Sequence, residues 1–310
     1  MTPAQLVDVR AVVVTYNSIA YVTQCLDSIL QEGVADVVVV DNASQDGSAH
    51  AAERLFDERV RVVRLDENVG FGAANNIGAD QPGGWRHLLL VNPDAELVAG
   101  CVLHLFELSV ARPRLGIGGG RTMSADGKTS APSCFTAPTW WSLTCFALGL
   151  TSAFRGHRVF DPESIWARWS LPEQKRVDIV SGALMLIPAA VWRRLDGFDA
   201  TFFLYGEDAD LCLRAAELGL QCWVSPLAMA THAVGASQTR SDKLVLLHKG
   251  KATLLRKHWR WPALAVGLLQ MGVGLRAVIG PEHEAWRGAW QRRSQWRRGY
   301  KSVPHCRRDN

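Results

Sequence analysis

The sequence lacks closely spaced cysteine pairs and a basic, apolar leader. Its seven cysteines are odd in number and scattered through 310 residues without a C-x-x-C motif, which argues against a disulfide framework and a structural zinc site. The N-terminus, MTPAQLVDVR, passes directly into an apolar run, so the pattern of a signal peptide is missing. We therefore expect a protein of the reducing cytoplasm.

A net positive charge is absent from most of the chain and is confined to its end. Residues 256–310 hold twelve Lys or Arg against three acids, an excess of nine positive charges. Because the whole chain carries +4, the first 255 residues carry −5. An anionic partner implied by this charge would meet the C-terminal segment and not the body.

Short β-branched runs alternate with helix-like segments from residue 9 to about residue 94. The expected strands are VRAVVVT, VADVVVVD, VRVVRL and WRHLLLVN, with helix-like segments at 19–33 and 48–56 and a glycine-rich turn before the last strand. Continuous apolar strands between helices indicate an α/β fold with a mainly parallel sheet covered on both faces. Ligands of such sheets bind at the carboxyl ends of the strands.

Polar residues follow three of these strands. The sets are Thr15-Tyr16-Asn17-Ser18, Asp41-Asn42-Ala43-Ser44 and Asn92-Pro93-Asp94. Turn chemistry alone accounts for any one of them, but three sets at one edge favour a binding site. The G-x-G-x-x-G fingerprint does not follow the first strand, which argues against a dinucleotide-binding dehydrogenase.

The pattern changes beyond residue 111. An irregular stretch from 132 to 172 indicates a specificity region or flexible loops. Its Trp140 and Trp141 either contact a ligand or fill a core, and the core is favoured for large aromatics. VDIVSGALMLI predicts a buried strand. PAAVWRRL predicts a short helix that begins at Pro188 and ends at Gly197.

Three carboxylates lie within four residues at the start of the next predicted helix, 208–218, which ends at Gly219. They are Glu207, Asp208 and Asp210. A structural explanation exists, because unpaired N–H groups and the macrodipole stabilise acids in the first turn of a helix. The functional alternative is that one of them takes a proton from a substrate.

Seven motifs stand in order between about residues 9 and 258. They are VVVTYNS, VVVVDNASQDGS, NVGFGAANN, LLLVNPDAEL, SGALMLIPAAVWRRLDGFD, FFLYGEDADLCLRAAELG and THAVGAS. Together they resemble a family 2 glycosyltransferase of the GT-A fold, in the branch of bacterial rhamnosyltransferases. The resemblance implies a nucleotide-sugar-binding GT-A domain over 1–240, with a nucleotide-binding half at about 9–110 and an acceptor and catalytic half at about 111–240. A helical C-terminal extension, 241–310, follows.

Enzymes of this family transfer a sugar from a nucleoside diphosphate donor to an acceptor hydroxyl, with inversion. The resemblance assigns donor binding to Thr15, Tyr16, Asn17, Asp41, Gly72, Asn75, Asn92 and Asp94. Asp41 would accept a hydrogen bond from the base or ribose, and Gly72 would let backbone approach the nucleotide. Asn75 is also explained as part of a helix start.

The leaving diphosphate carries charge that a divalent cation, Mg²⁺ or Mn²⁺, can neutralise. The resemblance makes Asp94 a metal ligand, but Asn92 replaces the first acid of the Asp-x-Asp that family members commonly have. His232 is expected as a further metal or diphosphate ligand, against the alternative of a structural histidine. Ser237 either donates a hydrogen bond to a phosphate or is a turn serine.

By the same resemblance Asp208 is the catalytic base that takes the acceptor proton. The helix dipole would hold it ionised, while Leu211, Ala215 and Leu218 anchor the helix. Glu207 and Gly182 are expected beside the acceptor, with Ser237 as a secondary contact there.

Two segments after residue 258 suggest a surface partner. WPALAVGLLQMGVGLRAVIG is interrupted by polar residues and marginal for a membrane span, so it is interfacial or buried. AWRGAWQRRSQWRRGYKSV interleaves Trp286, Trp290, Trp296 and Tyr300 with arginines, which suits an anionic membrane surface. A disordered basic tail is the alternative. Nucleic acid is not expected, because a lipid-linked acceptor already explains the basic aromatic segment.

The sequence therefore predicts an inverting glycosyltransferase that moves rhamnose from dTDP-rhamnose to a glycan or lipid-linked acceptor in cell-envelope polysaccharide synthesis. We expect it in the cytoplasm, peripheral on the inner face of the plasma membrane. A UDP-sugar transferase of the same fold is one alternative. A non-catalytic glycan- or nucleotide-binding module is another, which the missing first metal carboxylate keeps open.

Overall fold

A mixed β-sheet forms the centre of the larger lobe in this computed structural model, which describes residues 8–124, 132–168, 173–232, 239–280 and 282–301. Within these residues the strand order is β3-β2-β1-β4-β10-β6-β11-β5, with β8 paired to β11. The strands are β1 Val9–Thr15, β2 Asp36–Asp41, β3 Val60–Arg64, β4 His87–Val91, β5 Ala95–Leu97, β6 Leu115–Ser124, β8 Lys175–Val177, β10 Leu184–Pro188 and β11 Gln221–His232. Two short strands, β7 Cys134–Phe135 and β9 Ile179–Val180, pair separately.

The sheet is mainly parallel, as the sequence predicts. Strands β3, β2, β1 and β4 run parallel to one another, and β11 runs parallel to β6. Strand β10 lies antiparallel between β4 and β6. Because β10 is antiparallel, its first residue, Leu184, pairs with the last residue of β4, Val91, so the loop before β10 lies at the edge where β4 ends.

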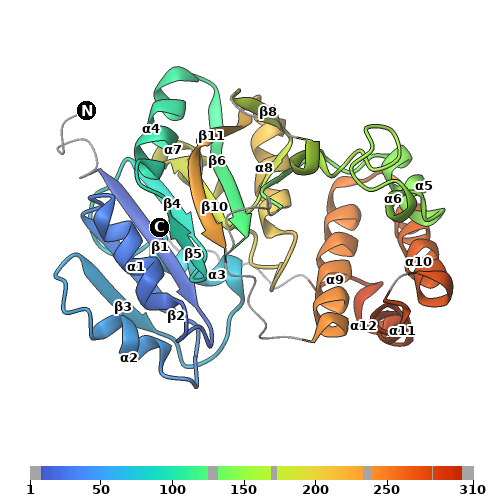
Figure 1. Cartoon of the computed structure of the whole chain (residues 1–310), viewed down its shortest axis with the longest axis horizontal. Helices are drawn as coiled ribbons and strands as arrows, with labels where there is room; N and C mark the ends of the chain where they lie inside the picture. The colour runs from blue at the N-terminus through green and yellow to red at the C-terminus, as the bar shows by residue number, and fades with distance from the viewer. Residues whose placement is uncertain (1–7, 125–131, 169–172, 233–238, 281, 302–310) are drawn as a thin grey trace.

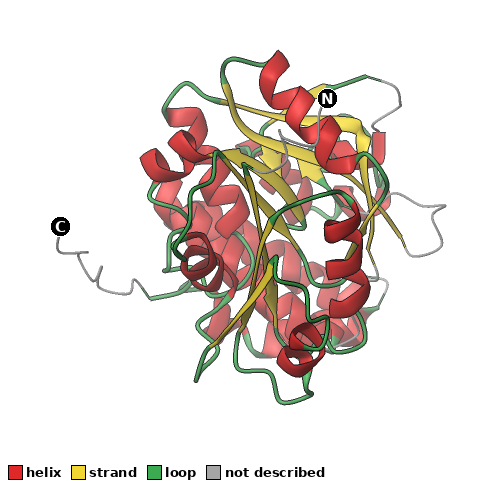
Figure 2. Ribbon diagram, turned by 90° about the vertical axis from the view of Figure 1, so that its left-hand side faces the viewer, coloured by secondary structure: helices red, strands yellow, loops and turns green. Residues whose placement is uncertain are grey.

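Helices cover both faces of the sheet (Figure 2). One face carries α1 Val22–Gln31, α2 Ser48–Glu53 and α4 Cys101–Ala111, and the other carries α3 Phe71–Ala79, α7 Ala189–Leu195 and α8 Glu207–Glu217. Alternate residues of β1 belong to different cores: Val12 packs with the α3 and α8 side, and Val13 with the α1 and α4 side. Side chains of a strand alternate between faces, so a strand buried on both sides is apolar throughout.

A second, helical lobe lies beside the sheet (Figure 1). It contains α5 Trp140–Ala147, α6 Leu150–Ala153, α9 Arg240–His258, α10 Pro262–Ile279, α11 His283–Gln291 and α12 Arg293–Trp296. Its core brings Leu143 of α5 together with Leu255, Leu269 and Trp296 of the C-terminal helices. Helix α5, from the middle of the chain, therefore packs with elements about a hundred residues further along.

Several local expectations are wrong. The glycine-rich segment before β4 contains helix α3, and the irregular stretch 132–172 contains α5, α6 and a 3-10 turn, Ile165–Arg168. The expected strand VDIVSGALMLI is two strands, β9 and β10, interrupted at residues 181–183. Pro188 ends β10 and precedes α7 instead of opening it.

Three side chains expected to pack in the core are exposed. Trp140 and Trp141 are 41% and 48% exposed, so the core interpretation of these two is wrong. Leu218 is 37% exposed, whereas Leu211 and Ala215 are fully buried, and only the latter two anchor α8.

The C-terminal basic segment is folded as far as residue 301. Trp296 is fully buried, and its indole N–H donates to Ala289 O at 2.9 Å. The Tyr300 hydroxyl donates to Leu204 O at 2.8 Å. The interpretation of this segment as a disordered tail is therefore wrong for its described part, and neither aromatic is available to a headgroup layer.

Helix α10 has one buried face and one exposed face. Among the described residues it is the one helix long and apolar enough to cross a membrane by length and composition, with 39% of its apolar window buried. Ala265, Leu269 and Val273 pack in the helical core, while Leu264 and Met271 are 60% and 47% exposed. The buried interpretation therefore holds for one face of this helix, and the other face is exposed.

Candidate active site

Five elements bring the predicted site residues to one edge of the sheet. Thr15 and Asp41 end β1 and β2, and residues 92–94 follow β4. The backbone N–H of Asn92 donates to Ala183 O at 3.1 Å, which joins this loop to the loop before β10. The N-terminus of α8 lies beside the same loop, because Gly182 N–H donates to Asp208 Oδ2 at 3.1 Å.

Thr15 and Asp41 form a polar pair with unused hydrogen-bonding capacity. They are partners in the parallel register of β1 and β2, and both are buried. Thr15 Oγ1 and Asp41 Oδ1 have no hydrogen-bond partner among the described residues, while Asp41 Oδ2 accepts from Ser44 N at 3.2 Å. Since buried polar atoms are nearly always paired, these two atoms mark a place for a polar ligand.

The loops after β1 and β2 fix each other. Asn17, at a positive φ of 52°, accepts from Gln45 N at 2.8 Å through Oδ1, and its own N–H donates to Ser44 Oγ at 3.0 Å. Tyr16 is left 47% exposed beside them, where its ring is accessible to a stacking ligand. Asn42, not singled out from the sequence, donates to Asn68 and accepts from Val69 N, so it holds the loop before α3.

Helix α3 closes one side of the site through its glycines. Gly70, at φ 90°, caps the helix, and a Cβ there would overlap Phe203 O. A Cβ on Gly72 would lie 3.0 Å from the Cβ of Phe198 and 3.6 Å from that of Glu207. The space that Gly72 leaves is therefore filled by protein, which differs from the expected close approach of a nucleotide. Asn75 donates to Phe71 O at 2.9 Å within the helix.

The backbones of two expected metal ligands, Asp94 and His232, lie near each other. His232 ends β11 opposite Ala95, the residue after Asp94, and Ser237 lies outside the described residues. Across the parts of the chain that the structure describes, no three His, Cys, Asp or Glu residues are grouped to hold a metal. One carboxylate and one amide still fit a hard cation that takes its remaining ligands from a diphosphate.

Asp208 lies at the start of α8 and is held by backbone. In addition to the Gly182 contact, Asp208 Oδ1 accepts from Ala209 N at 2.8 Å. A Cβ on Gly182 would meet the Phe71 ring at 3.3 Å and the Cβ of Asp208 at 3.7 Å. Glycine at this position therefore keeps the carboxylate and the Phe71 ring close to the loop before β10.

Glu207 and Asp208 form a pair of acids in different environments. Burial, and next the charge of Asp208, raise the pKa of Glu207 to about 8. Burial also raises the pKa of Asp208, while the N–H groups of Gly182 and Ala209 oppose that rise. The helix dipole is thus not the dominant influence on Asp208. Because the charge of Asp208 is among the causes that raise the pKa of Glu207, Asp208 is the member of the pair that loses its proton first.

Asp210 has a structural role. This fully buried carboxylate contacts Arg214 at 2.7 Å, Lys257 at 2.7 Å and His258 at 2.8 Å. Burial alone would raise its pKa, but the His258 hydrogen bond and the charges of Arg214 and Lys257 lower it to about 2. Asp210 therefore ties α8 to the end of α9.

Family models match most of this chain. The model described as glycosyl transferase family 2 matches residues 11–157, and that described as glycosyltransferase like family 2 matches residues 157–261. The chain belongs to glycosyltransferase family 2. It is therefore an enzyme, and the alternative of a non-catalytic binding module is set aside.

This glycosyltransferase is similar to an N-acetylglucosaminyl-diphospho-decaprenol L-rhamnosyltransferase of Mycobacterium tuberculosis (strain CDC 1551 / Oshkosh). The two are 27% identical over 284 residues, which cover 83% of this chain and 87% of the relative. The similarity confirms the resemblance to rhamnosyltransferases that the motifs predict.

Two solved structures share the GT-A fold of this glycosyltransferase. A mannosyltransferase from Pyrobaculum calidifontis in complex with GDP-Man and Mn²⁺ has a TM-score of 0.57 at 18% identity, covering 93% of this chain and 84% of that one. TarS residues 1–349 from S. aureus in complex with UDP-GlcNAc have a TM-score of 0.51 at 16% identity, covering 91% and 79%. They confirm the predicted fold.

Proposed function

We propose that this glycosyltransferase moves L-rhamnose from dTDP-rhamnose to a hydroxyl of a lipid-linked glycan in cell-envelope polysaccharide synthesis. The observation that carries the proposal is the placement of Asp208 by Gly182 at the sheet edge that also holds Asp41. The rhamnosyltransferase relative, which aligns over most of the chain, supports the choice of sugar and of a lipid-linked acceptor.

The strand ends bind the donor in this proposal. Asp41 Oδ1 accepts a hydrogen bond from the base or ribose, Thr15 Oγ1 lies next to it, and Tyr16 offers its exposed ring. Asp94, with Asn92 and His232, would hold a Mg²⁺ or Mn²⁺ ion together with the donor diphosphate. A bound divalent ion supplies positive charge to the leaving diphosphate.

Asp208 removes the acceptor proton. As the acceptor oxygen attacks the anomeric carbon, Asp208 takes the hydroxyl proton, the bond from carbon to diphosphate oxygen breaks, and the nucleoside diphosphate leaves with the electron pair. Attack from the face opposite the leaving group inverts the anomeric centre. Glu207, neutral beside it, leaves Asp208 as the ionised member of the pair.

We place the enzyme on the inner face of the plasma membrane, attached through α10. Its outward residues Leu264, Met271 and Val278 recur at intervals of seven and are 60%, 47% and 74% exposed, so they form one stripe. Trp261 is 60% exposed at the start of the stripe, with the Arg260 guanidinium 5.6 Å from its ring centroid. An apolar stripe bordered by cations fits an anionic bilayer surface.

Titration calorimetry and turnover test the donor. We expect dTDP to bind more tightly than UDP or GDP, more tightly still with Mg²⁺ or Mn²⁺, and dTDP-rhamnose to be consumed when a lipid-linked N-acetylglucosamine acceptor is added. Preference for UDP would replace the dTDP assignment with a UDP-sugar transferase. Absence of binding of all three nucleotides would contradict the proposed function.

A further inference from the structure

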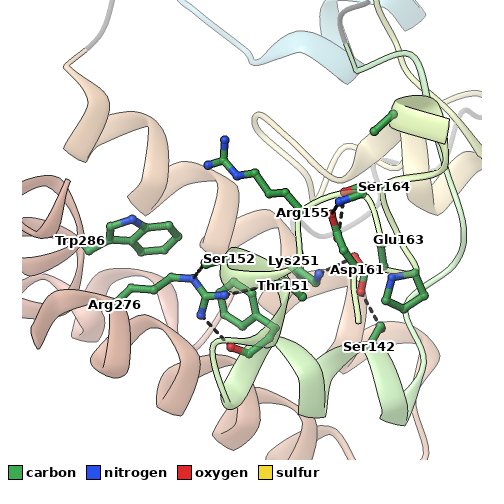
Figure 3. Close-up of a pocket in the computed structure, with 14 residues that line it drawn as sticks. Ser142, Thr151, Ser152, Arg155, Asp161, Glu163, Ser164, Lys251, Arg276 and Trp286 are labelled. Atoms are coloured by element: carbon green, nitrogen blue, oxygen red, sulfur yellow. Dashed lines mark hydrogen bonds and ion pairs between the residues drawn. The ribbon is translucent and has the colours of Figure 1, made fainter. Parts of the chain in front are cut away.

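A second cavity lies in the helical lobe, apart from the strand ends. Its volume is about 540 Å³, and it is bounded by the α5–α6 region, the segment 155–167 and helices α9, α10 and α11. Figure 3 shows Arg155, Lys251 and Arg276 around it, together with hydroxyl side chains and Trp286. Neither the family motifs nor the proposed donor site includes these residues.

Among the residues that the structure describes, Arg276 is a buried cation without an acidic partner. It is 3% exposed, and the guanidinium donates to neutral oxygens of this part of the chain: Phe146 O at 2.7 Å, Gly272 O at 2.9 Å, Ser152 Oγ at 3.0 Å and Thr151 Oγ1 at 2.6 Å. Burial lowers its pKa to about 10. A buried charge that is hydrogen-bonded but not neutralised is stabilised when an anion enters beside it.

The other charged groups leave the cavity with a positive excess. Its lining holds three cations, Arg155, Lys251 and Arg276, against two acids, Asp161 and Glu163. Glu163 is already engaged, because it accepts from Lys251 Nζ at 2.7 Å and from Ser142 Oγ at 2.6 Å. The lining therefore carries an excess of one positive charge, which favours a ligand that carries negative charge.

The uncharged part of the lining suits a sugar-bearing ligand. Phe146 and Trp286 supply aromatic faces, and Ser142, Thr151 and Ser152 supply hydroxyls. Cationic side chains bind phosphate oxygens strongly through charge-assisted hydrogen bonds. Hydroxyls and aromatic rings in a concave site fix the orientation of the rest of a ligand.

Helix α9 connects this cavity to the catalytic acids. Gly250 packs against the turn before α8, where a Cβ on Gly250 would overlap Tyr205 O. Lys251, one residue on, lines the cavity. Successive residues of a helix are rotated by about 100°, so the turn that leads into Asp208 and the cavity adjoin neighbouring faces of α9.

We propose that this cavity binds the phosphate-bearing headgroup of the lipid-linked acceptor, with Arg155, Lys251 and Arg276 facing its phosphate oxygens. This inference rests on the proposed function and adds to it where the acceptor is held. The exposed stripe of α10 lies on the same helix as Arg276, so the cavity belongs to the lobe that we place against the bilayer.

The test measures acceptor-headgroup binding with the donor site already filled by saturating nucleoside diphosphate. The full chain is titrated with geranyl diphosphate and, separately, with inorganic pyrophosphate. Arg155→Gln and Lys251→Gln should each weaken geranyl diphosphate binding by about tenfold, as expected for loss of one charge-assisted contact. Arg54→Gln, at an exposed arginine that follows the end of α2, is the matched control and should leave binding unchanged.

Arg276 needs a conservative variant because its hydrogen bonds also join α5 to α10. Arg276→Lys keeps the charge and should retain more binding than Arg276→Gln when both unfold at the wild-type temperature. Equal affinity of all the cavity variants and wild type would overturn the proposal. Pyrophosphate binding as tight as geranyl diphosphate would overturn its assignment to a lipid-linked ligand, whereas tighter geranyl diphosphate binding supports it.

The nucleotide titration separates this inference from the proposed function. If nucleoside diphosphate binds equally to wild type and to the cavity variants while geranyl diphosphate affinity falls, both stand. If nucleotide binds but geranyl diphosphate affinity is the same in every variant, the cavity assignment alone fails.

Discussion

At the scale of single residues, the end of β2 carries the most direct sign of a ligand. Asp41 Oδ1 and the neighbouring Thr15 Oγ1 are buried without a hydrogen-bond partner among the described residues. An unsatisfied buried polar group costs about 1–3 kcal/mol. A nucleoside that donates to Asp41 would remove this cost, so the free enzyme is prepared for the bound state.

Replacing Asp41 tests that role. Asp41→Asn keeps the size of the side chain but presents an amide to the donor groups of the nucleotide, so we expect the dissociation constant for the preferred nucleoside diphosphate to rise about tenfold to a hundredfold. Titration calorimetry measures it. Asp66→Asn, on an exposed loop, is the control, and equal affinities of both variants would contradict the assignment.

Glu207 and Asp208 show how neighbouring acids can differ in function. Glu207 is 4% exposed, with Oε2 unpaired among the described residues, and its pKa lies near 8. Asp208 instead accepts two backbone hydrogen bonds. A base must be ionised at the working pH, and this environment selects Asp208 over Glu207.

The raised pKa of Glu207 also predicts a pH-dependent stability. Folded protein keeps a proton on Glu207 that the unfolded chain loses above its ordinary pKa of 4.5, so the stability this proton contributes is lost as pH rises towards about 8. Glu207→Gln removes the dependence. Its free energy of unfolding should exceed that of wild type increasingly between pH 5 and 8, by on the order of a few kcal/mol.

Denaturant unfolding at several pH values measures this difference. Glu67→Gln, at an exposed site, should follow the wild-type curve. A constant difference between Glu207→Gln and wild type across the pH range would show that Glu207 titrates normally.

At the scale of elements, the start of α8 depends on α9. Asp210 receives Arg214 from its own helix and Lys257 and His258 from the end of α9. Arg214 also donates to the carbonyl oxygen of Leu195, the last residue of α7, at 2.6 Å. One carboxylate therefore aligns α7, α8 and α9 around the turn that carries Asp208.

Asp210→Asn should destabilise the fold by about 3 kcal/mol, because it leaves buried cations without their counter-charge. Glu217→Gln removes a 68% exposed carboxylate that also contacts His258, and it should cost under about 1 kcal/mol. Denaturant unfolding compares the two. Similar small losses in both variants would contradict a structural role for Asp210.

The elements differ in how well the sequence predicts them. Strands β1 and β2 follow from unbroken valine runs, because strands buried on both faces are apolar throughout. Helix α3 escapes prediction because its sequence, FGAANNIGA, is rich in glycine and asparagine, and its stability comes from packing against β1 and β2. Propensity is a weak guide where tertiary contacts decide.

The parts of the candidate site also differ in how well the sequence predicts them. The strand end with Asp41 and the helix start with Asp208 could be recognised from local patterns, and the family resemblance then singled out these two residues within them. The cavity around Arg276 could not, since its lining comes from α5, α9 and α10, whose contacts span more than a hundred residues. Local sequence carries no signal of such pairings.

At the scale of the whole molecule, the enzyme consists of a GT-A lobe and a helical lobe with its own core. The exposed apolar stripe and the cavity both belong to the helical lobe, whereas the strand-end site belongs to the sheet. Because Trp296 and Tyr300 are packed inside, removing the C-terminal segment would damage this lobe and could not test membrane binding cleanly.

Surface substitutions on α10 test membrane binding instead. Replacing Leu264, Met271 and Val278 together by Ser should reduce binding to phosphatidylglycerol vesicles by at least about tenfold, since each buried apolar side chain contributes roughly 1.5–3 kcal/mol. Vesicle co-sedimentation measures this. The control replaces three exposed apolar residues elsewhere, Phe56, Val110 and Leu227, and an equal loss in both variants would contradict a specific docking stripe.

The central claim is that Asp208 is the base of a glycosyl transfer. Its most direct test is to measure turnover and nucleotide affinity in Asp208→Asn, with Asp66→Asn as the control. Transfer should fall by at least about a hundredfold in Asp208→Asn, while the dissociation constant for the nucleoside diphosphate should change less than about threefold. Near-normal turnover in Asp208→Asn would contradict the assignment.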